Sequence, residues 1–468
     1  MKRNIFNSAM FLAMAALTFT ACSSSEDATS EGNVPPVNDQ TAINFGAYMN
    51  RSTTRGGWAG ELTTATLQGA DAGFGILAYY TDNQPYTPSA LPNFMYNQQV
   101  TFNDPDWTYS PLKYWPNEFG ETAVSTGTDR LSFFAYAPYV EVDPVTGYAT
   151  ADADYGIVGM TRATENGNPK VRYYASLDPD KRVDLCWALT ESGNPGDADY
   201  VKTVDLTKQT VNDKVKFNFR HALASVNVQI DAVFDAVNQG ANPIELDSKT
   251  RIWVRSVTFE GFATKGELNL NNDQPNPEWY NIFSTGLLTG EPVTIFDGRR
   301  DGREGFSDMP NEKPIAINPV LIQSNRYDEA ALPNNLSIFN ANTVVGVTTA
   351  TVNLFDANNG ADDEANKTMP IFVIPTGEPL RITITYDVET YDPKLVSSFL
   401  SDTETHGSSV ENKITQVVLN GADPLKLEAG KKYTIGLHLG MTSVKTTATV
   451  TEWTAGDNTN TDLPANNN

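Results

Sequence analysis

Apolar and polar residues alternate with a period of two in many short stretches of the chain, whereas long helical periodicity is hard to find. The first convincing stretch covers residues 41–49, in which apolar residues occupy every second position from Ile43 to Met49. Because successive side chains of a strand point to opposite faces, this alternation predicts a strand with one buried face. A polar loop that contains Arg51 and Arg55 and ends in two glycines follows at once.

Similar stretches recur along the rest of the chain, separated by turn-forming residues. They predict strands at residues 73–80, 93–102, 107–115, 131–137, 252–262, 266–270, 370–374, 380–388, 414–419, 432–439 and 444–453. Thr, Val, Tyr and Phe, which fit a pleated and half-buried surface, are frequent in these segments. The pattern indicates an all-β protein with many short strands and long loops.

A change of phase interrupts the alternation in the middle of the chain. From Val215 to Leu223 every second position is apolar except His221, and apolar residues again occupy every second position from Ala224 to Ile230. A shift by one residue moves all following side chains to the other face, which predicts a β-bulge or the start of a new strand. We place a domain boundary just before this region, between Leu206 and Val215.

The start of the chain has the pattern of an export signal. Two basic residues precede a largely apolar run over residues 5–19, and a small residue and Cys22 follow. The run is shorter than the roughly 20 residues of a membrane-spanning helix, and the whole pattern describes a secretory signal peptide. A cysteine at the first mature position resembles a bacterial lipoprotein signal; the alternative is an ordinary signal peptide with an incidental cysteine. We expect removal of residues 1–21, lipidation of Cys22 and a polar tether over residues 22–40.

Composition limits the possible classes of function. The chain has 468 residues, so about 430 remain after the leader and tether, which is too long for one core and suggests two domains or more. The formal net charge of −24 disfavours nucleic acid as a partner, because phosphates would be repelled. With Cys22 lipidated, Cys186 is the one remaining cysteine, so no intramolecular disulfide is possible. We expect Cys186 to be a small buried hydrophobic residue.

Residues that could carry catalysis or bind a metal are few. The histidines His221, His406 and His438 lie far apart in the sequence, and no histidine or cysteine pair has the spacing of a zinc site. His221 falls on the apolar face of its predicted strand, so we expect a buried, hydrogen-bonded core histidine. Nothing resembles a nucleophile elbow, a P-loop or a kinase signature, and the G-x-G-x-x-A string at residues 73–78 continues into a predicted strand and not into the helix that dinucleotide binding needs. We expect no enzymatic activity, no cofactor and no metal.

An aromatic cluster offers a different kind of candidate surface. Trp107, Tyr109, Tyr114 and Trp115 could stack on sugar rings, although aromatic residues of β-proteins more often pack in a core. This surface supports an alternative function, that of a monomeric surface lipoprotein that binds glycans through Trp107, Tyr114 and Trp115.

Several stretches resemble, in the same order, the fimbrillin family, the subunits of type V pili that Gram-negative anaerobes make as outer-membrane lipoprotein precursors. They are residues 107–110 with 113–116, 131–138, 215–226, 372–375 with 384–388, and 429–433, leading to a last strand that ends at Trp453. The resemblance implies a structural or adhesive pilus subunit, located in the fimbrium at the outer membrane and cell surface. It also implies other pilin subunits as partners and a ligand on a host or bacterial surface.

The resemblance further implies two transthyretin-like β-sandwich domains in tandem, over residues 56–210 and 211–468, the second with a polar tail. In the family, a trypsin-like protease cuts after an arginine and releases the first strand, and a strand of another subunit fills the vacated groove. Residues 41–55 would then be the first strand and a cleavable pro-segment, with Arg51 or Arg55 as the cleavage site. The alternative is an ordinary first strand with incidental arginines.

A polymerising subunit should also supply a donor strand from its C-terminus. Residues 454–468 have only Leu463 and Ala465 as apolar residues near their end, which makes this tail a poor donor. The alternating segment at residues 444–450 could serve instead. The position of the subunit in the stalk, tip or anchor of a pilus therefore stays open.

Overall fold

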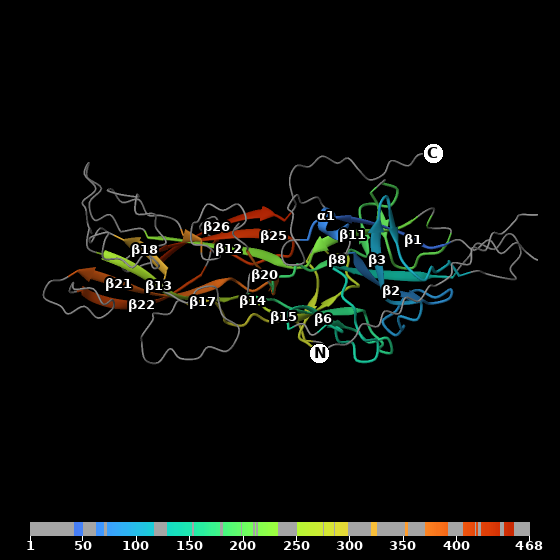
Figure 1. The fold of residues 1–468 in the computed structure, drawn as a ribbon, viewed down its shortest axis with the longest axis horizontal. Helices are drawn as coiled ribbons and strands as arrows, with labels where there is room; N and C mark the ends of the chain where they lie inside the picture. The colour runs from blue at the N-terminus through green and yellow to red at the C-terminus, as the bar shows by residue number, and fades with distance from the viewer. Residues whose placement is uncertain are drawn as a thin grey trace, which may run out of the picture. The chain divides into compact units, whose positions relative to one another are not determined.

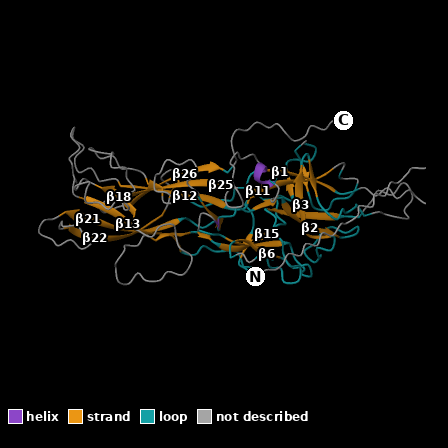
Figure 2. Cartoon of the chain, in the orientation of Figure 1, coloured by secondary structure: helices purple, strands orange, loops and turns teal. Residues whose placement is uncertain are grey.

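The computed structural model is all-β, as predicted, with a single short helix among the described residues (Figure 1, Figure 2). The structure describes residues 42–49, 62–69, 73–116, 129–151, 154–177, 181–197, 199–208, 211, 214–232, 250–274, 276–284, 286–297, 320–324, 352–353, 370–391, 406–416, 418–419, 423–439 and 444–453. Within these ranges the helix α1 (Thr64–Leu67) has a single turn, so no helix there could cross a membrane.

The first sheet closes on itself, because its outermost strands pair with each other. In sheet order its strands are β1 (Asn44–Met49), β11 (Lys214–His221), β8 (Cys186–Ala188), β5 (Leu131–Ala137), β2 (Phe74–Tyr80), β3 (Met95–Asn103) and β4 (Asp106–Thr108). The side chains inside it include Phe45, Phe74 and Phe217. β5 is buried along its whole length, because its other face, with Phe134 and Tyr136, packs into a second core.

Two further sheets share a core of their own. One contains β14 (Phe262–Ala263), β20 (Ile371–Pro375), β12 (Ala224–Ala232), β25 (Lys431–Leu439) and β26 (Val444–Glu452), with β19 (Val352–Asn353) beside β12. The other contains β17 (Val293–Asp297), β13 (Thr250–Glu260), β21 (Arg381–Tyr391) and β22 (His406–Gln416), with β18 (Val320–Ser324) beside β13. Buried residues of both sheets, such as Val228, Ile435 and Ile384, form one cluster, which is how sheets of a sandwich pack.

A smaller sheet joins strands from distant parts of the sequence. Its order is β16 (Trp279–Tyr280), β15 (Lys265–Asn269), β7 (Lys170–Tyr174) and β6 (Gly156–Met160). Two-stranded pairs are formed by β9 (Glu191–Ser192) with β10 (Val201–Lys202) and by β23 (Val418–Leu419) with β24 (Asp423–Pro424). β7 and β15 pair over their full lengths, so strands from both sides of the expected domain boundary share this sheet. The division into two tandem domains stays a prediction.

The change of phase after Leu223 marks the start of a new strand. β11 ends at His221 and belongs to the closed sheet, whereas β12 begins at Ala224 and belongs to the sheet that contains β25. Backbone hydrogen bonds fix the two residues between them: the Ala222 amide donates to Leu185, and the Gly430 amide donates to the Leu223 carbonyl. The change of phase in the alternation thus marks the point where the chain passes from one sheet to another.

The prediction of one strand over residues 107–115 is wrong. β4 ends at Thr108, and Pro111, which has no amide hydrogen to donate to a ladder, follows shortly after. The rest of this segment runs beside the start of the chain, where the Ile43 amide donates to the Lys113 carbonyl at 2.9 Å. β6, β7, β8, β17 and β18 were not predicted, because their short segments show no clear alternation.

Candidate assembly groove around the first strand

β1 completes the closed sheet, but its pairing on the two sides is unequal. On one side it runs parallel to β11 and pairs with it along its whole length. On the other side the described residues provide two residue pairs, that of Phe45 with Trp107 of β4 and an isolated bridge between Ala42 and Tyr114. Hydrogen bonds from the Ile43 amide to Lys113 and from the Tyr109 hydroxyl to Ile43 add to this edge. β1 therefore has one firmly paired edge and one loosely paired edge.

The apolar face predicted for the first strand is buried. Phe45 is 1% exposed, and Ile43 and Met49 are buried with it, whereas Asn44 on the other face is exposed. The Phe45 ring lies among three aromatic rings at centroid distances of 5.1–5.8 Å, those of Tyr109, Phe133 and Phe217. The side chains of β1 thus fill a trough lined by aromatic residues of the closed sheet.

The aromatic cluster predicted from the sequence forms one wall of this trough. The Tyr109 hydroxyl donates to the Ile43 carbonyl at 2.8 Å, and burial raises the pKa of the Tyr109 phenol, which keeps it a donor. Trp107 packs against the interior of the closed sheet, and Trp115 is 5% exposed. Tyr114 is exposed and Trp107 and Tyr109 are half-buried, so most of this cluster packs against the core; the alternative glycan-binding function stays a prediction.

Hydrogen bonds fix the chain on both sides of the loop that follows β1. The Thr64 hydroxyl at the start of α1 donates to the Met49 carbonyl at 3.0 Å. Further along, the Leu62 amide donates to the buried Asp184 carboxylate at 2.8 Å. A capping box between Thr63 and Thr66 closes the first turn of α1 and holds this segment in place.

The residues predicted for processing and lipidation lie outside the described residues. Arg51 and Arg55 fall in the interval between Met49 and Leu62, and Cys22 precedes the described chain. Cleavage after either arginine and attachment of lipid to Cys22 therefore stay predictions.

Removing β1 would leave an incomplete sheet with two kinds of unsatisfied surface. The backbone of β11 would lose its parallel partner and expose unpaired N–H and C=O groups. The trough that now holds Phe45 would open to water and expose aromatic surface. A strand with apolar side chains at alternate positions satisfies both needs at once, which is the chemistry of strand addition.

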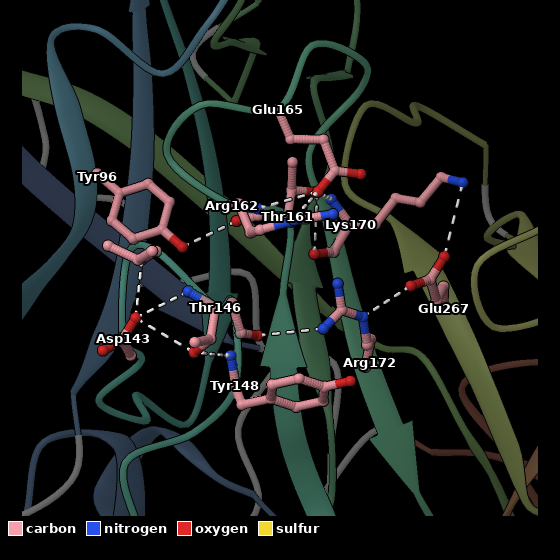
Figure 3. Close-up of polar contacts among 12 residues, drawn as sticks. Tyr96, Asp143, Thr146, Tyr148, Thr161, Arg162, Glu165, Lys170, Arg172 and Glu267 are labelled. Carbon is pink, nitrogen blue, oxygen red and sulfur yellow. Dashed lines mark hydrogen bonds and ion pairs between the residues drawn. The ribbon is translucent and has the colours of Figure 1, made fainter.

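A polar cluster on the four-stranded sheet has a structural explanation (Figure 3). Buried Arg172 of β7 donates through Nε to Glu267 of β15 at 2.9 Å, and through a terminal nitrogen to the Gly147 carbonyl at 3.2 Å. Lys170 lies 3.8 Å from the same carboxylate, and the Tyr148 ring lies over the guanidinium. Since Arg172 and Glu267 face each other in the strand register, we interpret them as a buried cross-strand ion pair.

His221 is buried, as predicted, but it has neighbours that the sequence did not reveal. Its Nδ1 lies 2.7 Å from Asp184 Oδ2 and 3.5 Å from Cys186 Sγ. One face of the ring stacks on Trp453 with a centroid distance of 4.2 Å. The spacing along the chain gave no sign of this contact, because it is the pairing of β8 with β11 that places Cys186 opposite His221.

Replacing His221 by Ala should lower the free energy of unfolding by about 1–3 kcal/mol, because Asp184 would lose a buried hydrogen bond and Trp453 would lose one of its stacking partners. Denaturant unfolding followed by tryptophan fluorescence measures this loss. The matched control is Lys216→Ala on the opposite face of β11, which should change stability by less than about 0.5 kcal/mol. Equal stability of the His221 variant and wild type would contradict a core role.

Comparisons with known proteins point to fimbriae. No protein-family model matches the chain. It is 26% identical over 260 residues to fimbrium subunit Fim1C of Phocaeicola vulgatus, an alignment that covers 54% of this chain and 57% of that subunit. The chain thus spans little more than half the length of this relative.

A crystal structure of a fimbrial protein from Bacteroides vulgatus has the same fold, with a TM-score of 0.50. The two proteins are 20% identical, and the match covers 89% of this chain and all of that one. The resemblance to fimbrial proteins that the sequence motifs predicted is confirmed.

Proposed function

We propose that this relative of a fimbrium subunit is itself a structural or adhesive subunit of a pilus at the cell surface. It is exported as a lipoprotein, activated by a trypsin-like protease that cuts after Arg51 or Arg55, and assembled by strand exchange with other pilin subunits. Catalysis has no part in this function. The name of Fim1C supports a fimbrial role, and the finer steps rest on the groove around β1.

The observation that carries the proposal is the unequal pairing of β1. A strand that belonged permanently to the sheet would gain from pairing on both edges, but β1 is firmly paired only with β11. Its hydrogen bonds to β11 are of the parallel kind, which is slightly less stable per residue than the antiparallel kind. An incoming antiparallel strand with the same apolar alternation could therefore replace β1 with a gain in stability.

The loop position also supports this proposal. Met49 and Leu62, the described residues on either side of the loop, are held by Thr64 and Asp184. A cut between them would separate β1 from the rest of the chain, while the Leu62 end stays anchored. The loop is polar and carries two glycines after its second arginine, a composition that favours proteolytic nicking.

Brief trypsin treatment of the exported chain, lacking residues 1–21, should convert a monomer into oligomers that resist denaturation in gel electrophoresis. Size-exclusion chromatography before and after cleavage measures the change. Truncation then locates the donor: loss of oligomers on removing residues 454–468 would implicate the tail, and loss only on removing residues 444–468 would implicate β26. A cut product that remains monomeric would contradict self-polymerisation and favour a tip or accessory subunit.

Replacing Cys22 by Ser should abolish labelling by a fatty-acid analogue and leave the precursor unprocessed, because the lipid is expected on the Cys22 thiol. Metabolic labelling followed by electrophoresis measures this effect. Cys186→Ala is the matched control, since it removes the other cysteine from a buried position and should leave labelling intact. Persistent labelling of the Cys22 variant would contradict the lipoprotein proposal.

A further inference from the structure

A buried cluster of metal-ligating side chains lies where β8 pairs with β11 in the closed sheet. Asp184 and Cys186 are two residues apart, and Cys186 faces His221 across the pairing of β8 with β11. One ligand atom from each of the three residues lies within 4.8 Å of the other two. The Asp184 and His221 side chains are 1% and 8% exposed, and Cys186 is fully buried.

The Asp184 carboxylate has an unused oxygen. Its Oδ2 accepts hydrogen bonds from the Leu62 amide and from His221, but Oδ1 has no hydrogen-bond partner among the described residues. A buried polar atom without a partner costs free energy and calls for a bound water or ion. The Asp184 carboxylate therefore has a buried oxygen with which it could contact a ligand.

The arrangement does not suit nucleophilic catalysis. In a Cys–His–Asp triad the two ring nitrogens face different partners, one the nucleophile and the other the carboxylate. Here both Cys186 and Asp184 lie against the same nitrogen, His221 Nδ1. Three different donor groups that converge on one point are the arrangement of a metal-binding site.

We propose that Asp184, Cys186 and His221 bind a divalent transition-metal ion of the zinc type. Thiolate, imidazole and carboxylate are the groups that bind Zn²⁺ in proteins. On binding, the Cys186 thiol gives up its proton and the His221 ring keeps its proton on Nε2, which leaves Nδ1 free to ligate. The charges of the thiolate and the carboxylate then cancel the charge of the ion, so that the buried site carries no net charge.

The distances are close to those required. Tetrahedral zinc ligands lie about 3.4–3.6 Å from one another, given the usual metal–ligand bond lengths. The distance of 3.5 Å between Cys186 Sγ and His221 Nδ1 meets this value. The distance of 2.7 Å between Asp184 and His221 is that of a hydrogen bond and would open by about 0.7 Å as the ion replaces the proton. A water molecule would complete the coordination.

Cobalt binding to the full chain tests the proposal. The parent protein carries Cys22→Ser, so that Cys186 is the only thiol, and is freed of metal with a chelator under reducing conditions. We expect one equivalent of Co²⁺ to bind with a thiolate-to-cobalt charge-transfer band and the strong visible absorption of a tetrahedral site. One equivalent of Zn²⁺ should abolish both bands and raise the melting temperature.

Matched variants show whether these three side chains are the ligands. Cys186→Ala and Asp184→Asn should each weaken cobalt binding by at least about tenfold, and the Asn side chain still offers an oxygen to the Leu62 amide. His406→Ala, in β22, should bind cobalt as the parent does.

Circular dichroism of the unliganded variants checks their folding. If Asp184→Asn does not fold, loss of the thiolate band in Cys186→Ala decides whether the cluster binds the metal. A parent without a thiolate band, or unchanged binding by Cys186→Ala, would overturn the proposal. Neither result would bear on strand exchange, which trypsin treatment tests separately.

Discussion

Replacing both Arg51 and Arg55 by Ala should abolish the trypsin-induced ladder of oligomers. Without a basic residue in this loop trypsin cannot separate β1 from the chain, so the trough around Phe45 stays filled and no foreign strand can enter. Gel electrophoresis of unboiled samples after a time course of digestion measures the ladder. Mass spectrometry of the wild-type product identifies the first cut, which should leave a new N-terminus at Ser52 or Gly56.

A matched control shows whether the effect is specific to cleavage in this loop or follows from the loss of any exposed arginine. Arg162 is a partly exposed arginine elsewhere in the chain, with a side chain that is 50% exposed, and Arg162→Ala should form the same ladder as wild type. The single replacements of Arg51 and Arg55 show which arginine is used first. A ladder that persists in the double variant would contradict activation by cleavage in this loop.

Replacing Phe45 by Ala should destabilise the uncleaved chain by about 3–5 kcal/mol, because it leaves a cavity among the rings of Tyr109, Phe133 and Phe217. Denaturant unfolding of the monomer measures this loss. Asn44→Ala, on the exposed face of the same strand, should change stability by less than about 0.5 kcal/mol.

The same Phe45 variant also distinguishes strand exchange from ordinary association. After cleavage and exchange the first strand has left the subunit, so the oligomers of Phe45→Ala and of wild type should resist heat and detergent equally. A variant whose oligomers are weakened as much as its monomer would show that β1 remains in the assembled subunit. That result would contradict strand exchange even if cleavage takes place.

The sequence predicts the elements of the groove well, but not its closure. The strict alternation from Ile43 to Met49 predicts β1 and its buried face, since a period of two is a local property. Closure of the sheet depends on the pairing of Phe45 with Trp107 and of β1 with β11, and contacts over such distances leave no periodic signal. The role of Tyr109 as a donor to the first strand could not be predicted for the same reason.

Polar residues inside the fold were harder to predict than apolar ones. Arg172 interrupts the apolar pattern of β7, so this strand was not predicted from the sequence. The strand is buried nonetheless, because the charge of Arg172 is paired with Glu267 across the sheet. His221 was predicted as a core residue from its place in the alternation. Its meeting with Cys186, 35 residues earlier in the chain, follows from the register of two strands and not from sequence spacing.

The pairing along the edge of β11 has a mechanical consequence for a filament. A strand seated along β11 in place of β1 would be bonded at its side, so tension along its axis loads all the hydrogen bonds together in shear instead of breaking them one by one. The backbone continues from β11 through Ala222 and Leu223 into β12, which itself pairs with β25 over eight residues. Force that enters a subunit at the groove would thus pass to the hydrogen bonds between β12 and β25, which are loaded in shear and extend over more residues than those along β11. We therefore expect the inserted strand to detach before β12 and β25 separate.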